Sequence, residues 1–203
     1  MGYYLQGLTM GLAYVAPIGV QNMFVINSAL TYRRRRALLT ALIVIFFDVT
    51  LALGCFFGVG AIMQRLAWLQ LVILLVGSLI VIYIGVGLLR SKPGELERSR
   101  AEMSIKKTIS SACVVTWFNP QAIIDGTMLF GAFHVSLPPS QSTPFIMGVA
   151  TASCLWFTGI TLLISLFSKH FNAKVLRIIN IVCGCIIVFY GVKLLWTFVN
   201  MVM

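Results

Sequence analysis

Residues 37–63, ALLTALIVIFFDVTLALGCFFGVGAIM, decide the fold of this chain, because they form a long apolar run directly after four arginines, Arg33 to Arg36. A transmembrane α-helix needs about 20 predominantly apolar residues to cross a hydrocarbon layer about 30 Å thick. Five further stretches of similar character fill most of the remaining sequence: residues 3–30, 68–89, 109–133, 144–167 and 175–201. The pattern predicts an all-α integral membrane protein with six transmembrane helices.

The composition excludes a water-soluble protein. Of the 203 residues, 60% are hydrophobic and 10% are charged, whereas soluble domains are about 45–50% apolar and about 25% charged. The net charge of +10 could indicate binding to nucleic acid. A basic run between two stretches of spanning length is instead typical of a cytoplasmic loop. We therefore expect a lipid bilayer around the chain and no nucleic-acid partner.

The distribution of basic residues predicts the orientation. The connections after the first, third and fifth apolar stretches contain 13 of the 15 lysines and arginines. Because cytoplasmic loops are enriched in these residues, we expect the three connections to face the cytoplasm. Both termini are then expected to lie outside the cytoplasm, and the count supports six crossings over five or seven.

The six helices are expected to form a single transmembrane domain, residues 1–203, with two related halves. Residues 1–90 would form the first three-helix repeat, residues 91–107 a cytoplasmic linker and residues 108–203 the second repeat. The two halves begin on opposite sides of the membrane, so they would be inverted-topology repeats. This arrangement is typical of secondary transporters.

A proline interrupts the first helix of each half. Pro17 precedes Asn22 by five residues, and Pro120 precedes Asp125 by five residues. Proline removes a backbone donor and crowds the carbonyl four residues earlier, so inside a bilayer the freed carbonyls need another partner. The prolines either only kink the helices or form a midplane binding site. Amide side chains near the prolines favour a site, because they are costly in lipid unless they line a polar cavity. They belong to Gln21, Asn22, Asn119 and Gln121, and Gly19 adds to the interruption of the first helix.

Two acidic residues lie inside apolar stretches, Asp48 and Asp125. A charge at the bilayer centre costs roughly 2.5–3.5 kcal/mol on insertion scales, so such residues usually face the bundle interior and mark a transport pathway. The alternative is a structural role, with Asp48 paired to a loop arginine or Asp125 near a helix end. We favour a functional role for both carboxylates.

Motifs of catalysis are not found in the sequence. It has no Walker loop, no Ser-His-Asp set and no dinucleotide-binding motif, so we expect neither an enzyme nor an ATP-driven pump. The five cysteines lie in apolar stretches without metal-ligand spacing, which predicts small packing residues, no metal site and no cofactor.

Two glycine pairs at four-residue spacing, Gly7 with Gly11 and Gly54 with Gly58, permit close helix approach. Packing within the bundle is favoured over packing between protomers, and a homo-oligomer stays open.

Several ordered motifs resemble the LysE family of basic amino acid exporters. They are Pro17-x-Gly19-x-Gln21-Asn22, Asp48, Thr116-Trp117-Phe118-Asn119-Pro120 followed by Asp125, residues 152–157 (ASCLWF, with Trp156) and residues 177–180 (RIIN). The resemblance covers practically the whole chain. The chain departs from the usual family pattern beside these motifs, at Val20, Phe47 and Ile123, and these departures bear on the identity of the solute.

The resemblance implies a secondary exporter of arginine or lysine in the inner membrane, and we expect export to be coupled to proton exchange. The residues expected to bind substrate or proton are Asp48, Asp125, Pro17, Gly19, Gln21, Asn22, Asn119, Pro120 and Trp156. Three alternatives stay open: an exporter of neutral amino acids or of a metal cation, a channel, and a membrane scaffold without transport. Paired carboxylates beside interrupted helices favour gated exchange.

Overall fold

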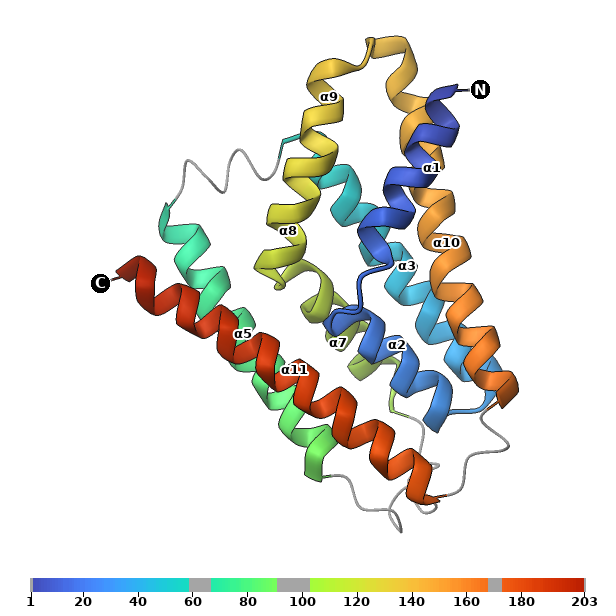
Figure 1. Cartoon of the computed structure of the whole chain (residues 1–203), viewed down its shortest axis with the longest axis vertical. Helices are drawn as coiled ribbons and strands as arrows, with labels where there is room; N and C mark the ends of the chain where they lie inside the picture. The colour runs from blue at the N-terminus through green and yellow to red at the C-terminus, as the bar shows by residue number, and fades with distance from the viewer. Residues whose placement is uncertain (1, 59–66, 91–102, 168–172, 203) are drawn as a thin grey trace.

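The computed structural model describes residues 2–58, 67–90, 103–167 and 173–202, which are almost entirely helical (Figure 1). The helices before residue 91 are α1 (Gly2–Val15), α2 (Val20–Thr31), α3 (Arg34–Phe56) and α5 (Ala67–Arg90). Those after residue 102 are α7 (Ile105–Trp117), α8 (Pro120–Gly126), the π-helix η1 (Thr127–Gly131), α9 (Ala132–Ser136), the 3₁₀-helix η2 (Pro139–Gln141), α10 (Ser142–Phe167) and α11 (Ala173–Val202).

Two of the described helical stretches are long and apolar enough to cross a membrane, Arg34–Phe56 and Pro139–Leu166. A third crossing results if α1 and α2, which meet at an angle of 79°, count as one broken span. The expected all-helical membrane architecture is therefore confirmed at this level. The predicted count of six crossings goes beyond these two to three spans and stays a prediction.

The apolar stretches differ from the observed helices mainly at their ends. Three of the four arginines expected in a loop, Arg34 to Arg36, form the first turn of α3, and Ser104 caps α7 three residues before the expected end of the linker. Basic side chains at a helix end extend into water. A helix boundary predicted from hydropathy therefore leaves out the last turn of the helical backbone. Residues 59–63 of the deciding stretch lie outside the described residues.

Glycines allow α1 and α10 to pack with their backbones in contact. A Cβ atom on Gly7 would collide with the carbonyl group of Phe145, and one on Gly148 would collide with the carbonyl of Tyr4. A Cβ on Gly11 would lie 2.7 Å from the Cβ of Ala152. Small residues serve this purpose in membrane bundles. The prediction that Gly7 and Gly11 pack within the bundle is confirmed.

Helices α5 and α11 form an antiparallel pair beside the other helices (Figure 1). Gly184 faces Leu89, whereas Gly191 faces Ile82, so the chain directions oppose each other. The pair contacts α2, α7 and α8, which are the helices next to the two breaks. Helix α3 lies at the centre, where it packs against α2, α7, α8 and α10. This arrangement surrounds the two helix breaks with protein on several sides.

Candidate functional site

The first break lies between α1 and α2, at residues 16–19. Pro17 has no N–H with which to continue the helix, and the chain turns before α2 begins at Val20. Asn22 donates from Nδ2 to the carbonyl oxygens of Val15 and Pro17, both at 2.8 Å. The partner that the freed carbonyls require is therefore a side chain of the next helix. Asn22 holds the break open.

Trp156 on α10 binds the amide oxygen of Asn22. Its Nε1 atom donates to Oδ1 of Asn22 at 2.8 Å, and Asn22 is buried. Each polar atom of the Asn22 side chain thus has a partner, which satisfies a group that would be costly to bury alone. Trp156 acts on the break through Asn22.

Asp48 lies deep between three helices, with 1% of its surface exposed. Its carboxylate accepts hydrogen bonds from Gln21 Nε2 on α2 at 3.0 Å and from Ser153 Oγ on α10. Both donors are neutral. The alternative partner, a loop arginine, is not what the structure shows: the guanidinium of Arg36 donates to the Met103 carbonyl and to Thr108 Oγ1 instead.

The second break separates α7 from α8 at residues 118–119. The Ile123 N–H donates to the carbonyl of Asn119 at 3.2 Å, so α8 begins directly after that residue. Trp117 ties the end of α7 to α3, because its Nε1 donates to Thr50 Oγ1 at 3.2 Å. A π-helical segment, Thr127–Gly131, follows α8; such segments are frequent at functional sites.

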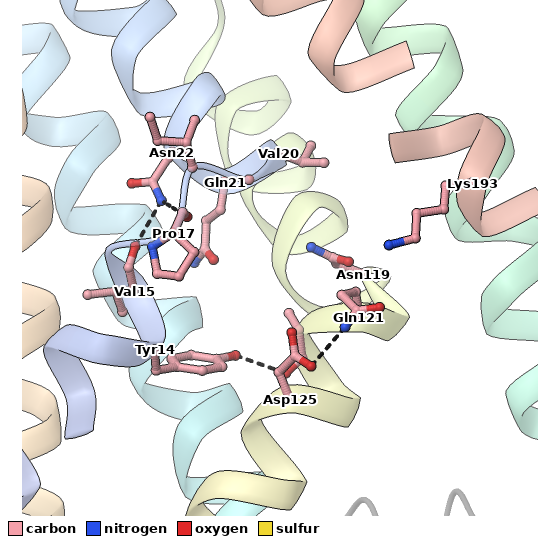
Figure 2. A pocket seen from close by; sticks show the side chains of 13 residues that line it. Tyr14, Val15, Pro17, Val20, Gln21, Asn22, Asn119, Gln121, Asp125 and Lys193 are labelled. Carbon is pink, nitrogen blue, oxygen red and sulfur yellow. Dashed lines mark hydrogen bonds between the residues drawn. The ribbon is translucent and has the colours of Figure 1, made fainter. Parts of the chain in front are cut away.

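A pocket of about 140 Å³ lies between the two breaks (Figure 2). One side is formed by the end of α1 and the start of α2, the other by α8 and by α11. The sequence-predicted residues that line it are Pro17, Gly19, Gln21, Asn22, Asn119 and Asp125; Gln121, Tyr14 and Lys193 line it as well. The structure thus brings the two proline motifs to one cavity, although about 100 residues separate them in the sequence.

The two aspartates hold different places relative to the pocket. Asp125 is exposed on the pocket wall and accepts a hydrogen bond from Gln121 Nε2 at 2.8 Å. Tyr14 crosses from α1 to α8 and donates to the carbonyl of Ala122 at 3.0 Å (Figure 2). Asp48 is not among the lining residues that the structure describes, and Gln21 lies between it and the cavity. The sequence does not predict this difference, because both carboxylates follow apolar residues.

Lys193 on α11 is a pocket residue that sequence reasoning missed. It is not among the residues predicted to bind substrate or proton, and it lies inside α11, which continues to Val202. In Figure 2 its side chain points from α11 toward Asn119 and Gln121. A signal existed in the sequence, because a lysine inside the apolar stretch 175–201 is costly in lipid and usually faces a cavity.

Comparison with known proteins identifies relatives that match nearly the whole chain. The profile of the family described as LysE type translocator matches residues 12–197. The arginine exporter protein ArgO of Escherichia coli K12 is 32% identical over 95% of this chain and 92% of the relative. The protein of that name from Klebsiella pneumoniae strain 342 is 33% identical over the same shares. No solved structure matches the chain.

These relatives confirm the resemblance that the motifs carry. A family of translocators also confirms a transport protein and not an enzyme, and together with the apolar helices it makes the chain a multi-pass membrane protein. Among the described residues, no group of three or more His, Cys, Asp and Glu side chains could hold a metal ion. Because the family profile covers residues 12–197 and the relatives match nearly the whole chain, the chain belongs to the LysE family of translocators.

Proposed function

We propose that this chain exports basic L-amino acids, arginine or lysine, across the cytoplasmic membrane in exchange for protons. The observation that carries the proposal is the pocket between the two helix breaks, which places a carboxylate, four amides and a lysine in one cavity. The names of the relatives point to the same solute class, since they are arginine exporters.

The groups around the pocket match the three charges of such a solute. Asp125 suits the cationic side chain, because a carboxylate can accept two hydrogen bonds from a guanidinium. The uncapped start of α2 at Gly19, with its helix dipole, suits the α-carboxylate, and Lys193 adds a positive charge on the opposite wall. Carbonyl oxygens at the end of α1 have a second lone pair for the α-amine.

Asp48 suits the proton. A buried carboxylate whose described partners are neutral is costly to keep ionised. Its hydrogen bond to Gln21 offers a route by which occupation of the pocket and protonation of Asp48 influence each other. Exchange of one monovalent cation for one proton would move no net charge, so the membrane potential would neither drive nor oppose it.

An arrangement of six spans in two inverted repeats suits alternating access. The packing supports it: α1 packs on α10, α7 and α8 pack on α3, α3 packs on α10, and α5 packs on α11. If the halves are equivalent, the first span of each half therefore packs on the second span of the other. With the basic connections in the cytoplasm, both termini lie outside the cytoplasm.

Uptake into inverted membrane vesicles tests this function. Arginine and lysine should enter in a saturable manner, show counterflow and accelerate with an imposed pH gradient. Under a voltage clamped with potassium and valinomycin, the rate should stay unchanged at zero pH gradient. Preference for neutral amino acids would identify a different solute, and transport without saturation or counterflow would identify a channel.

A further inference from the structure

A second cavity shares no lining residue with the pocket between the two breaks. It is an open pocket of about 800 Å³ at the N-terminal ends of α3 and α7. Four arginines line it, Arg33 to Arg36, together with Met103 and Ser104 from the segment before α7. The lining residues that the structure describes include no acidic side chain. The four arginines make the described part of the lining strongly positive.

Arg36 differs from its three neighbours. Its exposed fraction is 7%, whereas Arg33, Arg34 and Arg35 are exposed. Its Nη2 atom donates to the carbonyl of Met103 at 2.6 Å and to Thr108 Oγ1 at 2.7 Å, which holds the start of α7 against α3. Its Nη1 atom is buried and has no partner in the part of the chain that the structure describes. A buried guanidinium donor without an acceptor is unusual.

The backbone adds to the positive character of the pocket. Helix α3 begins at Arg34 without a side-chain cap, so its first N–H groups and its dipole point toward the cavity. Anions bind readily at such helix ends. An arginine fork also matches the geometry of phosphate oxygens, with two parallel hydrogen bonds.

We propose that this pocket binds a phosphate group, and that its source is the headgroup of an anionic phospholipid. The tetrahedral phosphate would accept from the exposed arginines, and Arg36 would join them once its buried Nη1 turned into the pocket. The positive-inside rule places this end of α3 at the cytoplasmic surface of the membrane, where anionic lipids gather around basic pockets between transmembrane helices. The bound headgroup would link the start of α3 to the start of α7.

Thermal unfolding of the full chain in neutral detergent tests the proposal, with tryptophan fluorescence as the readout. Short-chain phosphatidylglycerol should raise the midpoint by at least about 2 °C over the same concentration of short-chain phosphatidylcholine. Arg34→Gln/Arg35→Gln should lose at least half of that rise. Arg90→Gln/Lys106→Gln removes two exposed positive charges outside the lining and should keep it. If the double variant does not fold, the single Arg34→Gln and Arg35→Gln variants carry the same comparison.

The outcomes separate the sources of phosphate. An equal rise with inorganic phosphate, lost in the Arg34→Gln/Arg35→Gln variant, would overturn the lipid source in favour of a free phosphate. No rise with any phosphate compound would overturn the proposed phosphate site. A rise that survives in Arg34→Gln/Arg35→Gln, or that disappears equally in the control variant, would show a general charge effect and would overturn the site.

Discussion

Gln21 on α2 donates from Nε2 to Oδ1 of Asp48 on α3 at 3.0 Å, so a single hydrogen bond joins the wall of the pocket to a buried carboxylate. Ser153 on α10 donates to the other carboxylate oxygen. Asp48 on α3 is therefore hydrogen-bonded to both α2 and α10. Movement of α2 during transport would change the surroundings of this carboxylate.

Asp48→Asn should abolish export and leave the protein in the membrane. Asparagine has nearly the same shape and can still accept from Gln21, but it cannot ionise. Transport is measured in inverted vesicles, and the amount of protein by immunoblot of the membranes. Ser153→Ala is the control, because it removes one hydrogen bond and keeps the carboxylate; it should retain partial activity. Normal transport by Asp48→Asn would reduce Asp48 to a structural group.

Asp125→Asn should raise the apparent KM for arginine by about tenfold or more, because a hydrogen bond to a charged group contributes about 1.5–3 kcal/mol. Lys193→Gln should act on the other end of the solute. Competition by arginine and by its decarboxylated analogue agmatine measures this effect in vesicles. The unaltered chain should favour arginine, and Lys193→Gln should lose that preference. An unchanged ratio in Lys193→Gln would contradict a role for Lys193 at the α-carboxylate.

Asn22→Ala should destabilise the fold as well as impair transport. It removes the donor that both Val15 and Pro17 carbonyls share and leaves the indole N–H of Trp156 without its acceptor. Each buried polar group left unsatisfied costs about 1–3 kcal/mol. Thermal unfolding in detergent should show a fall of several degrees. Trp156→Phe removes only one of the three bonds and should cause a smaller fall; a larger fall would mean that packing of Trp156 dominates.

Gly7→Ala should separate α1 from α10. The added methyl group would collide with backbone atoms of Phe145. Backbone atoms cannot move aside as the end of a flexible side chain can. Such overpacking costs about 1–3 kcal/mol. Gly87→Ala on α5 is the matched control, because nothing lies within 4 Å of its Cβ position, and it should be neutral or slightly stabilising. Equal unfolding midpoints for the two variants would argue against close contact of α1 and α10.

A reporter that is active only in the cytoplasm should be silent when fused after Met203. The expectation follows from the concentration of basic residues in three connections. The same reporter inserted in residues 91–102 should be active. Cytoplasmic activity of the fusion after Met203, with transport intact, would show that the number of crossings is odd or that the orientation is reversed.

The sequence by itself determined the class of fold and the family. Apolar runs of spanning length admit only a helical membrane protein here, because backbone groups in lipid must be satisfied within their own segment. Pro17 and Pro120 indicated both helix breaks, since proline cannot donate to the helix. The ordered motifs around them indicated the LysE family, which the profile match over residues 12–197 confirms.

Only the tertiary structure decided which polar side chains meet. Asp48 and Asp125 have similar apolar neighbours in the sequence, but one lies behind Gln21 and the other on the pocket wall. Arg36 turns into the bundle although three identical residues precede it, and Lys193 faces the cavity from a mostly apolar helix. Hydropathy sets the length of a transmembrane helix, whereas its rotation and partners are set by packing against neighbouring helices. The pocket forms where those rotations bring two distant breaks together.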